Sequence, residues 1–448
     1  MKTFTAYRKF KSLLFMKNFI VIFLIIIGGC TSQSNKNALV SDTDLEYAKS
    51  VFTELQQALQ LDNGKLWNFK LDGPVLLINK ETKVVIANEP DEDGTLTKQG
   101  ELYVGILPEN IVGGNTTIEW LGKRWATYSL PLSEDRATRV DGLIHESFHR
   151  IQPEIGFDNI TDNHSVHLDT KDGRIFLKLE YEALNSALQS DEPLVHIKNA
   201  LHFRQYRHQL FPDSKNVENS LEIMEGLAQY TGSILSPRTD EEYKQYYITL
   251  IEMSKGFPSY VRSFAYFTIP VYGFFMKQDD EQWNLKINRD TNLTDFILAF
   301  YKLDQTTKNY ETIKKIGKLY GIENILEAED LREKNRLDQE RKYKSIFLSD
   351  SVLVIPLQKM SINFDPRNIT PLDSFGSVYP IMIVTDNWGI LHVDSLGALM
   401  SPEWNKVTLS YPKSITDSLV LGDGWRLKLN SPWKLKKVNV KYTLTDKQ

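Results

Sequence analysis

Two histidines four residues apart, with a glutamate directly after the first, lie in a segment of helical hydrophobic pattern. They are His145, Glu146 and His149. Side chains four apart in an α-helix lie one above the other on one face, so the two imidazoles can converge on one metal ion. Glu146 projects from the same turn, where it can act as a general base on a water molecule at that metal. A catalytic metal needs a third protein ligand, which we expect from a second helix.

Composition excludes several classes of protein. The 448 residues are 41% hydrophobic and 25% charged, which is typical of a globular protein of two or three folding units and excludes global disorder and a polytopic membrane protein. Residues 1–29 carry five Lys or Arg and no acid, so the rest of the chain has 48 basic against 58 acidic side chains. This net charge of −10 argues against a nucleic-acid partner.

The amino-terminal basic stretch runs into nine apolar residues, 19–27, and then into Gly28-Gly29-Cys30. The apolar run is too short to span a bilayer and has the order of a secretion signal. Residues 27–30 resemble the lipobox of bacterial lipoproteins. The resemblance implies that residues 1–29 are a signal peptide and that Cys30, diacylated, anchors the protein to a membrane of the cell envelope, outside the cytoplasm. An uncleaved anchor or a chance cysteine is the alternative. Because Cys30 is the only cysteine, no disulfide is expected.

The hydrophobic pattern predicts an α+β protein in three parts after the signal peptide. Residues 30–132 contain a polar tether, one amphipathic helix and short β-like runs that predict a small sheet. Residues 133–348 are mainly helical, with Ser133 as the expected N-cap of the histidine helix and residues 323–344 as a solvated charged helix. Residues 349–448 return to strands, including 438–442, and predict a β-sandwich-like accessory domain.

A second motif lies 76 residues after His149. The sequence Glu225-Gly226-Leu-Ala228-Gln-Tyr resembles the glutamate-helix signature of gluzincin metallopeptidases, Glu-Gly-hydrophobic-Ala-x-Tyr. The resemblance is limited to these two short motifs, which lie within about a third of the chain. The resemblance implies a zincin-like helical domain that binds Zn²⁺ through His145, His149 and Glu225, with Glu146 as the base. Small Gly226 and Ala228 would let the glutamate helix approach the histidine helix closely.

The chain departs from the gluzincin pattern in three places. The long gap between the motifs requires an inserted subdomain at about residues 155–215. No Gly-x-Met-Glu-Asn stretch is present, so exopeptidase activity is not supported. Where some gluzincins have an Asp that orients a histidine, this chain has Gln229, whose amide oxygen can accept an imidazole N–H.

The residues alone leave other third ligands open. Glu180 and Glu182 lie on a helical stretch 31 and 33 residues after His149, a separation that is also sterically possible. Glu222 is expected on the same helix face as Glu225, three residues before it. We favour Glu225 because only this acid lies among small residues.

Three further features bear on catalysis or substrate binding. A tyrosine donor for the oxyanion is expected from a helix near residues 263–274, with Tyr266 as first choice and Tyr272 as second, although both can instead simply pack in the core. The strand at residues 125–130 runs into the histidine helix and can be either an edge that pairs with a peptide or an interior strand. His164 and His167 are interpreted as surface or substrate-channel residues rather than as a second metal site.

The sequence therefore predicts a lipid-anchored, zinc-dependent metallopeptidase that cleaves peptide bonds in peptides or proteins outside the cytoplasm. Two alternatives remain at this stage. One is a non-catalytic binding lipoprotein with a degenerate or structural metal site, against which the intact Glu146 argues. The other is a zinc amidase acting on cell-wall peptides, which the motifs do not separate from a protease.

Overall fold

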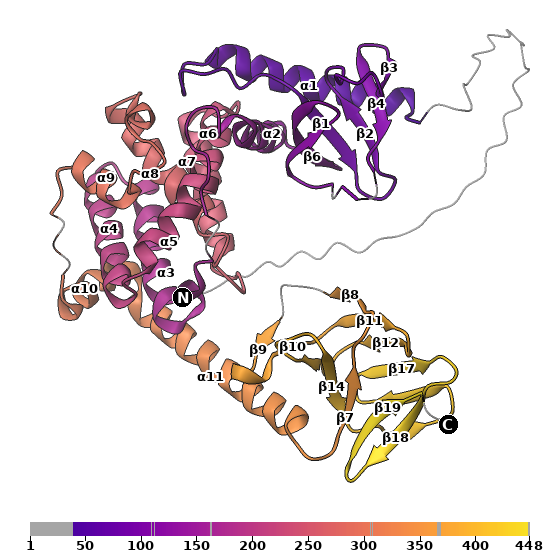
Figure 1. Ribbon diagram of the computed structural model, residues 1–448. Coiled ribbons are helices and arrows are strands. Elements are labelled where there is room, and N and C mark those ends of the chain that lie inside the picture. Colours follow the sequence, from indigo (N-terminus) through magenta and orange to yellow (C-terminus); the bar gives the residue numbers. More distant parts are fainter. Residues whose placement is uncertain are drawn as a thin grey trace, which may run out of the picture.

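The computed structural model describes residues 39–446 except 109, 112, 162–163, 305, 307 and 365–368. The signal peptide, Cys30 and nearly all of the tether predicted from the sequence lie outside these residues. The described chain has a mixed α+β architecture, with a small sheet, a helical region and a carboxyl-terminal region of strands (Figure 1). None of the helices in the described ranges has the length and apolar character needed to cross a bilayer.

The amino-terminal region pairs one helix with a six-stranded sheet. Helix α1 (Asp42–Asp62) begins after Ser41, whose side chain accepts a hydrogen bond from the Asp44 N–H. The strands are β1 (Val75–Asn79), β2 (Val84–Ala87), β3 (Thr97–Gln99), β4 (Leu102–Ile106), β5 (Thr116–Trp120) and β6 (Lys123–Leu130). Their order in the sheet is β3-β4-β2-β1-β6-β5, and only β1 and β6 run parallel.

Both faces of this sheet are buried along its central strands. Val75, Leu77 and Ala126 face the main core, which α1 and the histidine helix share, whereas Ile78 and Trp125 belong to a smaller core on the opposite face. Strand β6 lies between β1 and β5, so the alternative that residues 125–130 form an edge is wrong. The edge strand next to the histidine helix is β5, which the sequence reading did not identify.

The helical region follows directly. Its α-helices are α2 (Arg136–Ile151), α3 (Lys171–Gln189), α4 (Pro193–Leu210), α5 (Ser214–Leu221), α6 (Leu227–Leu235), α7 (Asp240–Ser254), α8 (Ala265–Asp279), α9 (Leu293–Phe300), α10 (Tyr310–Gly317) and α11 (Ile322–Phe347). Helix α2 is capped by Asp135, whose carboxylate accepts from the Thr138 N–H, and not by Ser133 as expected. Helices α3 and α4 fill the long gap between the two motifs.

A π-helical turn, η2 (Glu222–Gly226), joins α5 to α6 without interrupting the helical path. Its wider repeat is visible in the hydrogen bond from the Leu227 N–H to the Glu222 carbonyl, five residues back. Gly226 does not approach the histidine helix as expected. A Cβ at Gly226 would lie 2.9 Å from Ile269 of α8, whereas it is Gly232 whose Cβ would lie 2.5 Å from the Asp141 carbonyl oxygen on α2.

The carboxyl-terminal region consists of two sheets around one core. The strands are β7 (Val352–Pro356), β8 (Ser361–Phe364), β9 (Thr370–Pro371), β10 (Ser377–Tyr379), β11 (Met382–Asp386), β12 (Gly389–Val393), β13 (Ala398–Met400), β14 (Lys406–Ser410), β15 (Ser414–Ile415), β16 (Leu419–Gly422), β17 (Trp425–Leu429), β18 (Lys434–Val438) and β19 (Lys441–Thr445). Leu353 and Val407 of one sheet pack with Val384, Leu391 and Leu427 of the other, which gives a two-layer arrangement.

Of two predictions for the end of the chain, one is wrong and one is confirmed. The expected single strand at residues 438–442 is wrong, because Asn439 has a φ of +56° and forms a hairpin turn between β18 and β19. The charged helix is confirmed as α11, which leads from the helical region to the two sheets (Figure 1). Most of α11 is solvated, but Glu329 is buried and pairs with Arg174 and Lys178.

Candidate metal centre

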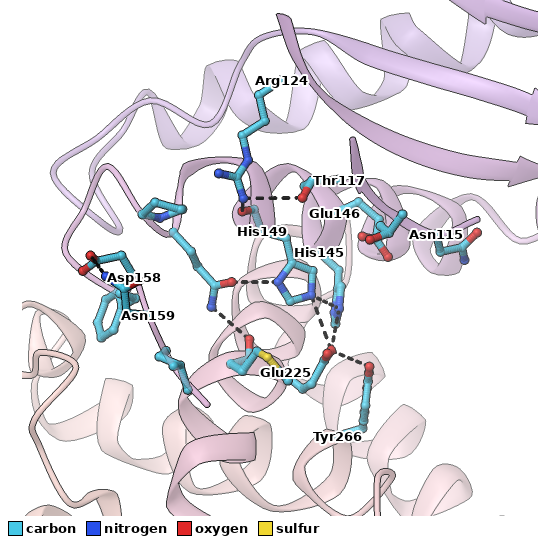
Figure 2. A pocket seen from close by; sticks show the side chains of 16 residues that line it. Asn115, Thr117, Arg124, His145, Glu146, His149, Asp158, Asn159, Glu225 and Tyr266 are labelled. Carbon is cyan, nitrogen blue, oxygen red and sulfur yellow. Dashed lines mark hydrogen bonds and ion pairs between the residues drawn. The ribbon is translucent and has the colours of Figure 1, made fainter. Parts of the chain in front are cut away.

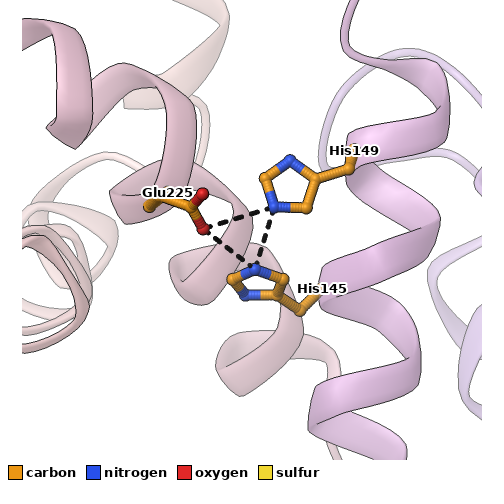
Figure 3. Close-up of side chains that lie close together, drawn as sticks. All are labelled: His145, His149 and Glu225. Carbon is orange, nitrogen blue, oxygen red and sulfur yellow. Dashed lines mark hydrogen bonds and ion pairs between the residues drawn. The ribbon is translucent and has the colours of Figure 1, made fainter. Parts of the chain in front are cut away.

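Three side chains from two facing helical segments converge on one point. His145 and His149 project from α2, and Glu225 approaches from η2 (Figure 3). The two Nε2 atoms lie 3.0 Å apart, and each lies 3.4 Å from Oε2 of Glu225. Within the described residues, this is the only group of three or more His, Cys, Asp or Glu side chains close enough to hold a metal ion.

A glutamine fixes the orientation of His149. The Nε2 of Gln152 donates to the carbonyl oxygens of Ile223 and Met224, at 3.3 and 2.9 Å. The Oε1 of Gln152 therefore faces His149, and its distance to Nδ1 is 2.7 Å. Because this oxygen can only accept, Nδ1 of His149 carries a proton, and Nε2 is left to face Glu225, where it can hold a second proton or bind a cation.

A second glutamine acts in the same way on His145. The Nε2 of Gln229 donates to Oδ1 of Asp141 at 3.0 Å and to Oγ of Ser233 at 2.9 Å. Its amide oxygen is left to accept from His145, as expected from the sequence. Burial lowers the pKa of His145 below its ordinary value, and the hydrogen bond to Gln229 is among the smaller effects that raise it. Each glutamine also ties α2 to the segment that carries Glu225.

Three acceptor atoms this close together require positive charge among them. Burial is the largest single effect on the pKa of His149 and lowers it, but the hydrogen bonds to Glu225 and Gln152 and the charges of Glu225 and Glu146 together raise it above its ordinary value, which favours a proton on this imidazole. Burial raises the pKa of Glu225, but hydrogen bonds with His145 and His149 lower it by more and keep this group ionised. Ligand atoms about 2.0–2.1 Å from a tetrahedral zinc lie about 3.3 Å from one another. The observed separations of 3.0–3.4 Å are therefore short enough for the three side chains to share one metal ion.

Glu146 is the buried acid beside this group. It lines the same pocket, and its Oε2 is buried without a hydrogen-bond partner among the described residues. Burial raises the pKa of Glu146 to about 7, against the opposing effect of His149. An acid with a pKa near neutrality and an unused oxygen is suited to accept a proton from a bound water.

Of the two tyrosine candidates, only Tyr266 reaches the pocket. Its hydroxyl donates to Oε2 of Glu225 at 2.5 Å, and its ring stacks on that of His145. Burial raises the pKa of Tyr266 well above its ordinary value, so the hydroxyl keeps its proton. Tyr272 is fully buried, and its hydroxyl donates to Glu180 at 3.1 Å. The interpretation of Tyr272 as a second choice for the oxyanion donor is therefore wrong.

The alternative third ligands are directed elsewhere. Glu222 is buried and accepts two hydrogen bonds from Arg204, at 2.7 and 3.0 Å, and one from Thr268 at 2.7 Å. The expectation that Glu222 shares a face with Glu225 is wrong, because the π-helical turn spreads two side chains that an α-helix would place about 60° apart. Glu182 pairs with Lys255.

Glu180 belongs to a buried network that the sequence did not reveal. Arg204 and Arg207 each donate to Glu180 at 2.8 Å, and Arg207 also donates twice to Glu218. All these charged side chains are at most 1% exposed. The network holds α3, α4, α5 and η2 together, so it supports the segment that carries Glu225 from behind.

The second histidine pair does not form a metal site in the described residues. His164 is exposed, whereas Nε2 of His167 lies 2.7 Å from Oε1 of Glu218. Nε2 of His208 lies 3.1 Å from the other oxygen of Glu218. Since Arg207 already neutralises this carboxylate, His167 extends the buried network rather than a second metal site.

The convergent group lies in a pocket of about 540 Å³ between the sheet and the helices (Figure 2). Strands β5 and β6 and the residue before β5 contribute one wall, and the segment after α2 contributes another. The lining residues are Asn115, Thr116, Thr117, Arg124, His145, Glu146, His149, Gln152, Pro153, Phe157, Asp158, Asn159, Ile160, Met224, Glu225 and Tyr266. A molecule that filled this pocket would contact the edge strand β5 and the three convergent side chains together.

Comparisons of the chain with protein-family models, with curated proteins and with solved structures find no match. The functional argument for this protein therefore rests on its own residues and their geometry.

Proposed function

We propose that the protein is a zinc-dependent peptidase of gluzincin type. The observation that carries this proposal is the convergence of three acceptor atoms from His145, His149 and Glu225 within 3.0–3.4 Å, next to a buried acid with an unused oxygen. A purely structural metal site has no need of Glu146. The location of the group in an open pocket, rather than inside the core, also favours catalysis.

Five residues of the pocket have defined roles in this proposal. A zinc ion held by the three side chains supplies Lewis-acid chemistry, which polarises a carbonyl group and acidifies water. Glu146 accepts the proton of the attacking water and passes it to the leaving amine. Tyr266 donates its hydroxyl proton in a hydrogen bond to the oxyanion, after exchanging Glu225 for the substrate oxygen as its partner.

The sheet edge provides the means of binding a polypeptide. Strand β5 pairs with β6 on one side only, and Thr116 and Thr117 of β5 line the pocket. An extended peptide can add to this free edge as a further strand, with main-chain hydrogen bonds that are independent of its sequence. The peptide then crosses the pocket close to His145, His149 and Glu225, which supports a polypeptide substrate and internal cleavage.

The test is the replacement Glu146→Gln, compared with the wild-type protein after zinc loading. We expect the variant to retain about one zinc per chain and to lose hydrolysis of a mixed peptide library by a factor of about 10²–10⁴, the usual contribution of a general base. Melting temperature and zinc content control for folding. Unchanged hydrolysis by this variant would eliminate the mechanism, and cleavage of cell-wall peptides alone would favour an amidase.

We also propose that the protein is exported and anchored to a membrane of the cell envelope through acylated Cys30. The proposal rests on the signal-like order of residues 1–30. A Cys30→Ser variant should move from the membrane fraction to the soluble extracytoplasmic fraction, and mass spectrometry of the wild-type amino terminus should show the lipid. An unmodified Cys30 would contradict it.

A further inference from the structure

The pocket contains one cationic side chain, Arg124 of β6. Among the described lining residues it is the only Lys or Arg, and Figure 2 shows it extending from the sheet toward His149 and Thr117. Its Nη2 donates to Oγ1 of Thr117 and to the carbonyl oxygen of His149, both at the long distance of 3.4 Å. Its Nε is buried and donates no hydrogen bond within the described chain.

Arg139 shows how a guanidinium with a carboxylate partner is hydrogen-bonded in this fold. Arg139 of α2 forms the two-pronged pair that arginine favours with carboxylates, with Nε and Nη2 each donating at 2.9 Å to the two oxygens of Glu54. The acid nearest to Arg124 is Glu119, opposite it on β5, at 3.8 Å from Nε. That distance is too long for a hydrogen bond, and the Glu119 side chain is 74% exposed. Arg124 therefore has only a loose, exposed ion pair with Glu119 and not the two-pronged hydrogen-bonded pair that Arg139 forms.

The other charges of the pocket leave Arg124 as its anion-binding group. Asp158 lies across the pocket and is already paired with Arg289 at 2.9 Å. Glu225 points toward His145 and His149 rather than toward Arg124 (Figure 2). A carboxylate that enters along β5 thus meets one guanidinium with free donors.

We propose that Arg124 binds a carboxylate group of the substrate, so that the site prefers peptides with a carboxylate near the bond to be cleaved. The inference rests on the proposed peptidase function and adds the substrate class. The carboxylate can come from an Asp or Glu side chain or from the carboxyl terminus of a peptide. A charge-assisted, two-pronged hydrogen bond predicts a preference of about 10- to 100-fold over the neutral analogue.

The test uses the mature protein loaded with zinc and one cleavable peptide in matched pairs. The first pair differs by Glu or Gln near the cleaved bond, and the second by a free or amidated carboxyl terminus. We expect wild-type kcat/KM to favour the acid of at least one pair by about tenfold or more, which identifies the source of the carboxylate. Arg124→Gln should remove this ratio, and Arg124→Lys should retain part of it.

Two controls separate recognition from a structural role. Lys123→Gln removes the neighbouring cation of β6, which pairs with Glu89, and should leave the acid-to-neutral ratio unchanged. Glu119→Gln removes the competing acid and should increase the ratio. If Arg124→Gln lowers kcat/KM equally for both members of each pair, Arg124 only supports the His149 carbonyl and the inference fails.

Binding to the zinc-loaded Glu146→Gln variant, measured by calorimetry, distinguishes this inference from the proposed function. Tighter binding of acidic peptides that is lost in Glu146→Gln/Arg124→Gln supports Arg124 even if wild-type protein hydrolyses nothing. Hydrolysis without any preference for acidic peptides overturns the inference and leaves the peptidase proposal intact.

Discussion

Glu222 and Glu225 lie in the same π-helical turn, three residues apart, yet their surroundings are opposite. Glu222 is buried against a guanidinium that the chain itself supplies, Arg204, and Thr268 completes its hydrogen bonds. Glu225 faces the pocket, where its partners are two imidazoles and the hydroxyl of Tyr266. One carboxylate has a guanidinium beside it within the fold, whereas the other has only imidazoles and a hydroxyl group around it.

These two glutamates show why residue type and position in the sequence do not by themselves identify a metal ligand. Both residues are glutamates in one short helical segment, and their separation would suit either as a metal ligand. The difference arises from α4, which brings Arg204 to one side of the turn, and from α2, which brings His145 and His149 to the other. A carboxylate already neutralised by arginine gains little from a metal, whereas Glu225 needs a proton or a cation nearby.

The largest expected effect is that of Glu225→Gln on zinc binding. Losing one of three protein ligands should remove about a third of a total binding free energy of roughly 10–16 kcal/mol, so affinity should fall by about 10³-fold or more. The matched variant Glu222→Gln should bind zinc normally while folded. Competition with a chromophoric chelator measures both, and equal loss of zinc in the two variants would contradict the comparison.

Arg204→Met tests the surroundings of Glu222, the glutamate that is paired with arginine. It leaves Glu180 and Glu222 buried without their main cation, which should lower the free energy of unfolding by about 3–5 kcal/mol. Urea denaturation measures this change. The control Arg336→Ala removes an exposed arginine that pairs with Glu333 and Glu340 on α11, and should cost less than about 1 kcal/mol. A similar small cost for Arg204→Met would show that the network does not stabilise the fold.

Gln152→Ala tests whether the glutamine that contacts His149 contributes to zinc binding at Glu225. Without the amide oxygen that accepts from Nδ1, His149 loses its fixed orientation, and zinc affinity should fall by about 10- to 100-fold. Gln189→Ala on α3 is the control, since this glutamine bonds only to Asn185 in the described chain. A normal zinc affinity in Gln152→Ala would mean that packing alone orients the ring.

The smallest expected effect is the pH dependence of zinc binding. The pKa of His149 lies above its ordinary value of 6.5, because the combined effects of Glu225, Glu146 and Gln152, of which Glu225 contributes most, outweigh burial. Zinc must displace this proton, so its affinity should be constant above the raised pKa and fall by about tenfold for each pH unit below it. Glu225→Gln removes the largest of the effects that raise the pKa of this imidazole, so the fall should begin at lower pH. Isothermal titration in buffers of different ionisation heat measures the released proton.

Local patterns were sufficient to predict the elements that carry the site. The spacing of His145 and His149 predicted one helix face, and alternation and turns predicted the small sheet and the strands of the last hundred residues. Strand β5 was missed because its residues do not alternate clearly, and the hairpin at Asn439 was hidden because residues 438–442 alternate between apolar and polar side chains as a single strand would.

The partners of the site required tertiary contacts that no pattern gives. Gln152 follows the histidine motif closely, and its position three residues after His149 was the available signal, but its role depends on carbonyl groups 71 and 72 residues away. Nothing in the sequence around Arg204 and Arg207 indicates burial, and it is the packing of α3 against α4 that buries them. Glu222 was misplaced because a π-helical turn has no reliable sequence signature.

The π-helical turn makes the protein unusually sensitive to a change in chain length at one place. Deleting a single residue between Glu222 and Gly226 would return the turn to α-helical spacing and rotate everything on one side of it by about 100° relative to the other. Either the arginine contact or the imidazole contact would then be lost, although no charged residue had been removed. At this point of the chain, the number of residues matters as much as their identity.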